Sequence, residues 1–222
     1  MSQTLFVEGM PGSGKSTSAA KLQVSLAAQG VGVAAFQEMA AAHPLHVGEL
    51  DEMGAAMARV HEKFQPSEFA ELALARCRSF RAEADVTIFE SFPIQSYLRV
   101  LMQMGAEPSE IWSFWDELQE AFNDANPALI YFREPTPGAN FREVAASRGR
   151  EWTEYIVASM EQTPYASSRG LKGFEGIAKL FRDYGELSVS AVERWRFPKL
   201  ELPATPESFE DRDQSVLRFA LR

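Results

Sequence analysis

Short apolar runs alternate along the chain with stretches whose apolar residues recur at helical spacing. The apolar runs predict five strands, at Thr4–Glu8, Val31–Gln37, Asp85–Glu90, Leu129–Phe132 and Leu200–Leu202. Helical patterns occupy Ser18–Gln29, Glu49–Phe64, Ser67–Ala84, Gln95–Met104, Ser109–Phe122, Ala139–Ser147, Glu151–Gln162, Glu175–Trp195, and a last segment from the capping residue Ser208 to about Leu221. Strands that alternate with helices predict an α/β fold, with a five-stranded parallel sheet covered by helices on both faces.

Composition narrows the class of protein. At 222 residues and 45% hydrophobic, the chain has the size of a single domain, 1–222. A formal net charge of −9 argues against non-specific binding to nucleic acid, and no apolar run approaches membrane-spanning length. The single Cys77 excludes an internal disulfide framework, and its helical context predicts a small buried apolar residue. Because the chain enters its first strand without a signal peptide, we expect a cytoplasmic protein.

The segment after the first strand has the spacing of a phosphate-binding loop. Gly9-Met10-Pro11-Gly12-Ser13-Gly14-Lys15-Ser16-Thr17 matches G-x-x-x-x-G-K-S between a strand and a helix. Its backbone N–H groups and the positive end of the following helix suit a phosphate. The motif predicts a bound nucleoside triphosphate, with Lys15 on the β- and γ-phosphates and Mg²⁺ on the Ser16 hydroxyl. The expected ATP-binding residues are Gly9, Pro11, Gly12, Ser13, Gly14, Lys15, Ser16 and Thr17.

Polar residues follow the other strands. Glu38 comes after the second strand, Glu90 ends the third, and Arg133 with Glu134 follows the fourth. Ligands of parallel α/β sheets lie beyond the carboxyl ends of the strands, so we expect these residues to meet in one cleft. Glu90 is expected to hold Mg²⁺, directly or through water, and the alternative is a surface acid at a strand end. Glu38, on a strand expected to neighbour that of the phosphate loop, is a candidate general base toward a hydroxyl acceptor.

Three arginines follow the fourth strand. Arg142 lies on a short helix, and Arg148 and Arg150 flank a glycine. The planar guanidinium group can bridge two phosphate oxygens, so the segment from about 136 to 151 is interpreted as a lid that closes over the phosphates. Pro137-Gly138 would allow that movement. The alternative is three solvated arginines among acidic neighbours.

The order of these features resembles the thymidylate kinase and deoxynucleoside kinase superfamily. The phosphate loop, Glu38, Glu90-Ser91, the strand after Pro127 and the Arg-x₅-Arg-x-Arg segment carry the resemblance, which covers nearly the whole chain. The chain looks closer still to uncharacterised bacterial kinase-like P-loop proteins, on three segments: Glu90-Ser91-Phe92-Pro93-Ile94-Gln95, Ser147-Arg148-Gly149-Arg150-Glu151-Trp152 and Pro164-Tyr165-Ala166. The resemblance implies a three-layer P-loop kinase fold, Mg·ATP, and phosphoryl transfer to a small molecule.

The chain also departs from those families. Ser91 stands where deoxynucleoside kinases have an arginine, and Gln37-Glu38-Met39 stands where thymidylate kinases have Arg-Glu-Pro. These departures argue against a pyrimidine nucleoside or nucleotide as the acceptor, and another hydroxylated small molecule, such as a nucleoside-like metabolite or an antibiotic, is the candidate.

Three further segments carry weaker signals. The aromatic stripe of Ser109–Phe122 suits either the core or a homodimer interface. Ser168–Gly176, with three glycines and two cations, suits either an anion-binding loop or a connection between helices. His43 and His46, in the loop after Glu38, have no recognisable metal-ligand spacing and are candidates for contact with an acceptor.

Two functions fit these observations. The first is a small-molecule kinase that transfers the γ-phosphoryl group of ATP to a hydroxyl, with Lys15, Glu38, Glu90 and the lid arginines as catalytic residues. The alternative is a P-loop ATPase or switch that acts with a protein partner. The chain contains neither an Asn-Lys-x-Asp motif nor a Leu-Ser-Gly-Gly signature, and the arginines favour the kinase.

Overall fold

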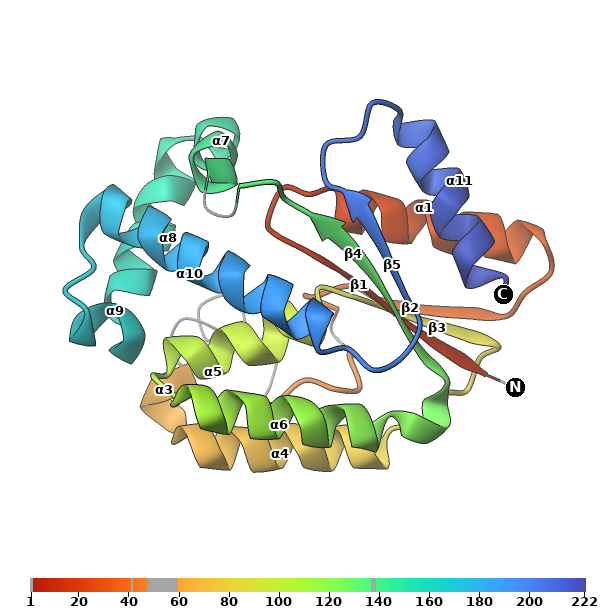
Figure 1. The fold of residues 1–222 in the computed structure, drawn as a ribbon, viewed down its shortest axis with the longest axis horizontal. Coiled ribbons are helices and arrows are strands. Elements are labelled where there is room, and N and C mark those ends of the chain that lie inside the picture. Colours follow the sequence, from red (N-terminus) through yellow and green to blue (C-terminus); the bar gives the residue numbers. More distant parts are fainter. Residues whose placement is uncertain (1, 41, 48–59, 137–138) are drawn as a thin grey trace.

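The computed structural model describes residues 2–40, 42–47, 60–136 and 139–222. Its strands form one parallel sheet in the order β2-β3-β1-β4-β5 (Figure 1). Their bounds are β1 (Gln3–Gly9), β2 (Val33–Phe36), β3 (Val86–Glu90), β4 (Pro127–Arg133) and β5 (Lys199–Pro203). The predicted five-stranded parallel sheet is therefore confirmed. The expectation that the strand before Glu38 adjoins the phosphate-loop strand is wrong, because β3 lies between β2 and β1.

Helices cover both faces of the sheet, which makes three layers (Figure 1). One face carries α1 (Lys15–Ala28) and α11 (Phe209–Ala220), whereas α4, α6 and α10 lie on the other. Besides α1 and α11, the helical elements of the described residues are α3 (Val60–Lys63), α4 (Pro66–Ser79), a π-helical turn η2 (Ile94–Leu98), α5 (Arg99–Gln103), α6 (Pro108–Ala121), a 3₁₀ turn η3 (Asn123–Ala125), α7 (Ala139–Arg148), α8 (Arg150–Glu161), α9 (Pro164–Ser168) and α10 (Gly173–Glu193).

The two faces of the sheet are packed by alternate residues of each strand, as the period of a strand requires. On β1, Leu5 and Val7 pack toward α1 and α11, and Phe6 packs into the larger core on the opposite face. Both cores are apolar and their side chains are almost fully buried. Glu8 follows Phe6 on the same face at the next alternate position, so its carboxyl group also points into the larger core.

Most predicted helices agree with the structure within a few residues, and two differ more. The helix predicted at Ser67–Ala84 ends at Ser79, because Phe80 takes an extended conformation. The helix predicted at Glu49–Phe64 falls largely outside the described residues, and only Val60–Lys63 is seen as helical. The aromatic stripe of α6 is a core face, with Trp115 and Leu118 fully buried.

The structure also places two smaller features of the sequence. Cys77 is buried on α4, as predicted, and burial raises the pKa of its thiol to about 12. The segment Ser168–Gly176 connects α9 to α10, where the Gly173 N–H donates to the carboxylate of Glu161 and the Arg169 guanidinium lies 3.8 Å from the centre of the Tyr165 ring.

No helix in the described part of the chain has the length and hydropathy of a transmembrane span.

Candidate functional site

The phosphate loop has the predicted strand–loop–helix form. Strand β1 ends at Gly9, and α1 begins at Lys15. A Cβ atom on Gly9 would lie 2.6 Å from the Ser13 hydroxyl oxygen and 2.9 Å from the Phe132 carbonyl oxygen, so only glycine fits where the loop leaves the sheet. The Ser13 N–H donates to the Met10 carbonyl at 3.1 Å, which closes the loop on itself.

Lys15 lies inside this loop. Its side chain is 6% exposed, and its ammonium group is 3.4 Å from the Met10 carbonyl oxygen. Ser16 and Thr17 follow on the first turn of α1 and are exposed. The Lys15 ammonium and the positive end of α1 therefore lie together at the loop, which favours the binding of a phosphate group there.

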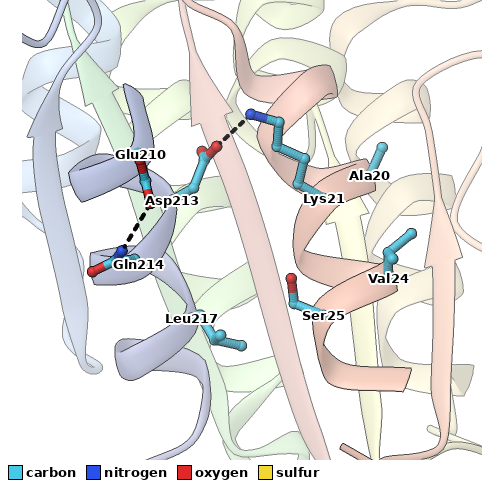
Figure 2. A pocket seen from close by; sticks show the side chains of 8 residues that line it. All are labelled: Ala20, Lys21, Val24, Ser25, Glu210, Asp213, Gln214 and Leu217. Atoms are coloured by element: carbon cyan, nitrogen blue, oxygen red, sulfur yellow. Dashed lines mark hydrogen bonds and ion pairs between the residues drawn. The ribbon is translucent and has the colours of Figure 1, made fainter. Parts of the chain in front are cut away.

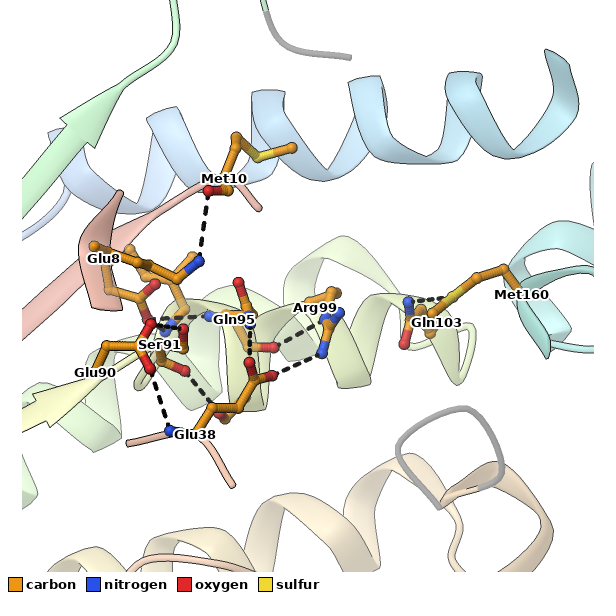
Figure 3. A network of polar contacts seen from close by, with 12 residues as sticks. Glu8, Met10, Glu38, Glu90, Ser91, Gln95, Arg99, Gln103 and Met160 are labelled. Atoms are coloured by element: carbon orange, nitrogen blue, oxygen red, sulfur yellow. Dashed lines mark hydrogen bonds and ion pairs between the residues drawn. The ribbon is translucent and has the colours of Figure 1, made fainter. Parts of the chain in front are cut away.

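Glu90 joins the phosphate loop to β3. The Ser16 hydroxyl donates to one Glu90 carboxylate oxygen at 2.8 Å, and the Ser91 hydroxyl donates to the same oxygen at 2.6 Å (Figure 3). The Glu38 backbone N–H donates to the other oxygen at 3.3 Å. The two residues expected to hold Mg²⁺ are thus adjacent, and both present the oxygen ligands that this ion prefers. Among the described residues there is no cluster of three or more His, Cys, Asp or Glu that could hold a metal by itself.

Glu38 reaches the same cleft even though its strand is one position further from β1 than expected. One carboxylate oxygen accepts from the Gln95 side-chain amide at 2.6 Å, and the other lies 3.5 Å from the Arg99 guanidinium (Figure 3). Arg99 in turn donates through Nε to the Gln95 carbonyl at 3.1 Å. The carboxylate is therefore held in place by η2 and α5. Glu90 lies between it and the phosphate loop, since Glu90 accepts from the Glu38 N–H and from the Ser16 hydroxyl.

A cavity of about 600 Å³ brings these groups together. Its polar wall includes Lys15, Ser16, Glu38, Glu90, Gln95 and Arg99. The facing wall comes mainly from α8 and is largely apolar, with Trp152, Tyr155, Ile156 and Met160 of α8 and Phe181 of α10. A cavity with a few convergent polar groups opposite an apolar wall is the usual form of a small-molecule site.

The three predicted lid arginines do not meet in this cavity. Arg148, at the end of α7, lines it. Arg142 instead pairs with Glu175 of α10 and lies 5.4 Å from the centre of the Phe174 ring. Helix geometry explains the difference, because residues six positions apart on one helix point in directions about 120° apart.

Arg150 also lies away from the cavity. It pairs with Glu154 one turn further along α8, at 2.7 Å, and its side chain is 88% exposed. Trp152, two residues later, points about 200° around the helix from Arg150 and lines the cavity. Arg142 and Arg150 therefore do not line the cavity in this structure, and the expectation that they close over a bound triphosphate stays a prediction. The hinge residues Pro137 and Gly138 lie outside the described residues.

The convergence of strand ends holds for three strands of the four. The ends of β1, β2 and β3 meet at the cavity, whereas Arg133, at the end of β4, turns toward β5 and forms an ion pair with Glu201 at 2.5 Å. Glu201 lies on the neighbouring strand β5. Pro203 is the residue that pairs with Arg133 in the sheet, and Glu201 comes two residues before it.

Sequence reasoning missed several residues of the site. The sequence places Arg99 only in a predicted helix, and it places Gln95 and Trp152 only in helices and in segments that resemble kinase-like proteins. Their roles depend on which strand ends lie beside them, and a single sequence does not carry that information. Arg212 of α11 was missed for the same reason: its guanidinium group lies beneath the loop and donates to the Ser13 carbonyl at 3.1 Å and to the Ser18 hydroxyl at 2.9 Å.

Glu8 was also missed. Its carboxyl group is fully buried, and burial raises its pKa to about 8 in spite of nearby Lys15 and two backbone N–H donors. It belongs to the same polar network, which Figure 3 shows next to the loop.

A second hollow lies between α1 and α11 (Figure 2). It measures about 550 Å³, and its main polar feature is the ion pair of Lys21 with Asp213 at 2.7 Å. The other carboxylate oxygen of Asp213 accepts from the Ser18 hydroxyl at 3.0 Å. These bonds fasten α11 to the phosphate-loop helix and explain the polar residues of the groove.

Comparison with known proteins adds one result. No protein family model and no curated protein sequence matches the chain. Among solved structures, the chain is similar to the YorR protein of Bacillus subtilis, which was crystallised in complex with phosphorylated GDP. The alignment has 11% sequence identity and a TM-score of 0.48, and it covers 99% of this chain and 96% of that one.

Proposed function

We propose that this protein is a kinase that transfers the γ-phosphoryl group of ATP to a hydroxyl group of a small molecule. The observation that carries the proposal is the meeting of the phosphate loop, Glu90 and Glu38 in one cavity that also has an apolar wall. The first two features suit a triphosphate and its metal ion. The last two suit a separate small acceptor, which an ATPase would not need.

The phosphate loop would hold the triphosphate. Its backbone N–H groups and the first turn of α1 favour the phosphate oxygens, and Lys15 lies at the mouth of the loop. In phosphoryl transfer, charge spreads over the oxygens of the transferred group, and a lysine held nearby stabilises it. Arg148 lies on the opposite wall and would add a second cation from the other side.

Ser16 and Glu90 would hold Mg²⁺. The hydroxyl oxygen and the carboxylate lie 2.8 Å apart, and the Ser91 hydroxyl and the Glu38 N–H orient the carboxylate. When bound, Mg²⁺ supplies positive charge to the phosphate oxygens. Direct and water-mediated binding by Glu90 are both compatible with this arrangement.

Glu38 would act toward the acceptor. Its carboxylate is 23% exposed and is held by Gln95 and Arg99, so it can accept a hydrogen bond from an attacking hydroxyl group without a large rearrangement. As a general base it would take the hydroxyl proton during transfer. Trp152, Ile156 and Phe181 would contact the apolar part of the acceptor and exclude water from the reacting atoms.

A screen for acceptor-dependent ADP release tests the proposal. The protein is incubated with Mg·ATP, and in parallel with Mg·GTP, against a library of nucleosides, sugars, alcohols and hydroxylated antibiotics. We expect little ADP without an acceptor, and rapid ADP release with an acceptor that mass spectrometry then finds in phosphorylated form. Glu38→Gln should abolish most of this release and leave ATP binding intact.

Rapid hydrolysis of ATP without any acceptor, unaffected by Glu38→Gln, would contradict the kinase. It would favour an ATPase or switch that acts with a protein partner.

A further inference from the structure

Glu8 occupies a position where a carboxyl group is costly. It is the last residue of β1 before Gly9, it is 0% exposed, and the three residues before it, Leu5–Val7, are apolar and fully buried. Moving an ionisable group into such a core is unfavourable unless its polar atoms are satisfied. No part of the phosphate-loop motif requires an acid here, since the motif begins at Gly9.

The structure shows what this carboxyl group does. One oxygen accepts from the Ile94 N–H at 2.6 Å and from the Gln95 N–H at 3.1 Å (Figure 3). These N–H groups belong to the first turn of η2, where helical N–H groups have no partner within the helix. Glu8 therefore caps η2 from a neighbouring strand.

The turn that Glu8 caps carries the residues that hold Glu38. The Gln95 side chain donates to Glu38 at 2.6 Å, and Arg99, one turn later, lies 3.5 Å from the same carboxylate. In the other direction, the chain passes from Glu8 straight into Gly9. One side chain thus connects the start of the phosphate loop with the wall of the cavity that holds Glu38.

We infer that Glu8 is a positioning residue that fixes the Gln95–Arg99 wall, and with it Glu38, relative to the phosphate loop. Its effect on catalysis rests on the proposed kinase function, whereas its effect on η2 does not. Glu8 touches neither the triphosphate nor the acceptor in this scheme and acts through Gln95.

The charged and titratable groups around Glu8 explain which replacement preserves its role. Lys15 of α1, Glu90 of β3, Tyr131 of β4 and Tyr184 of α10 all interact with it electrostatically. Burial is the largest influence and favours the uncharged acid, and the second carboxyl oxygen has no hydrogen-bond partner among the described residues. A glutamine has the same shape, no charge, and a carbonyl oxygen for the two N–H groups.

The test compares Glu8→Gln, Glu8→Leu and a control, Thr4→Val. Thr4 lies on the same strand, is fully buried, and has a hydroxyl group without a hydrogen-bond partner in the described part of the chain. Hydrogen exchange at Ile94 and Gln95 is measured without ligand, together with binding of a fluorescent ATP analogue and acceptor-dependent turnover. Glutamine should behave like the wild type in all three measurements, as should the Thr4 control.

Glu8→Leu should leave binding of the ATP analogue nearly unchanged. Loss of two hydrogen bonds should make the Ile94 and Gln95 amides exchange about 30-fold faster. Turnover should fall about tenfold or more through kcat, while the KM for ATP stays near that of the wild type.

Wild-type exchange at Ile94 and Gln95 in Glu8→Leu would overturn the inference. So would a glutamine variant as impaired as the leucine variant, because hydrogen bonding could then not explain the effect. If the wild type shows no acceptor-dependent turnover, the kinase proposal fails, and the exchange data still decide whether Glu8 holds η2.

Discussion

Acidification should destabilise this protein through two buried histidines, and replacing His43 with Phe should remove about half of that loss. His43 and His46 stack with ring centres 4.0 Å apart and an angle of 7° between the rings. Each is 7% exposed, and His43 also packs against the rings of Phe89 and Phe92. A proton on either ring would put a charge into an aromatic core.

The pKa values of both rings follow from this environment. Burial, and then the neighbouring His46, lowers the pKa of His43 to about 3. Burial lowers the pKa of His46 to about 4, although the nearby Glu38 backbone works in the other direction. The unfolded chain, with a histidine pKa near 6.5, therefore binds more protons than the folded chain below that pH. Stability that is present above pH 6.5 is lost as the pH falls toward the folded pKa values.

Between pH 7 and pH 5 this linkage costs about 2 kcal/mol for each histidine, or about 4 kcal/mol for the pair. Glu8 works in the opposite direction. Its folded pKa of about 8 lies above the unfolded value, so ionisation in the unfolded chain destabilises the protein as the pH rises above 4.5. Lowering the pH from 7 to 5 should recover about 2 to 3 kcal/mol at Glu8. The wild type alone thus hides much of the histidine effect.

Urea unfolding of the wild type and of a histidine variant, at pH 7 and at pH 5, isolates the contribution of the histidines. On moving from pH 7 to pH 5, His43→Phe should lose about 2 kcal/mol less than the wild type. His43→Gln packs differently and also cannot titrate, so it should show the same difference between the two pH values. Equal pH dependence in the wild type and both variants would refute the assignment of buried neutral histidines.

Four further predictions concern single residues. Lys15→Ala should lower turnover about a thousandfold, because a cation at the transferred phosphate is lost, and kinetics at saturating ATP measure this. Glu90→Gln should raise the Mg²⁺ concentration needed for half-maximal turnover, and an unchanged Mg²⁺ titration would contradict its role. Arg148→Ala should lower kcat about tenfold, whereas Arg150→Ala, its exposed neighbour, should have no effect. Glu8→Gln should lose about 2 to 3 kcal/mol more than the wild type between pH 7 and pH 5, measured by urea unfolding.

Local patterns predicted much of the fold and the centre of the site. The phosphate loop was recognisable because its function requires fixed residue types at fixed spacing, from Gly9 to Ser16. Glu90 was recognisable because it ends a continuous apolar strand, and parallel strands direct their carboxyl ends to one edge of a sheet. Both inferences use sequence neighbours alone. In the structure the loop and Glu90 are in contact, through the hydrogen bond from Ser16 to Glu90.

The order of the strands could not be obtained in the same way. The apolar runs of β1, β2 and β3 are interchangeable by composition, and their pairing depends on how the crossover helices pack. Glu38 was consequently expected on a strand beside β1, yet β3 separates the two. The positions of the lid arginines without ligand were not predictable for a related reason. Charge and spacing identified the segment, but the direction of each side chain depends on which face of α7 and α8 packs against α10.

Glu8 lies between these two cases, because half of its role was open to sequence reasoning. An acid inside the run Leu5-Phe6-Val7-Glu8 alternates onto the same face as Phe6, and a buried strand leaves such a group no access to water. That combination indicates a carboxyl group with a buried partner. The partner itself, the first turn of η2, lies more than eighty residues away and reaches Glu8 only when β3 pairs with β1. An ionisable residue in an apolar strand beside a phosphate loop therefore indicates a buried hydrogen-bond partner near the site. Which residue is that partner depends on the fold.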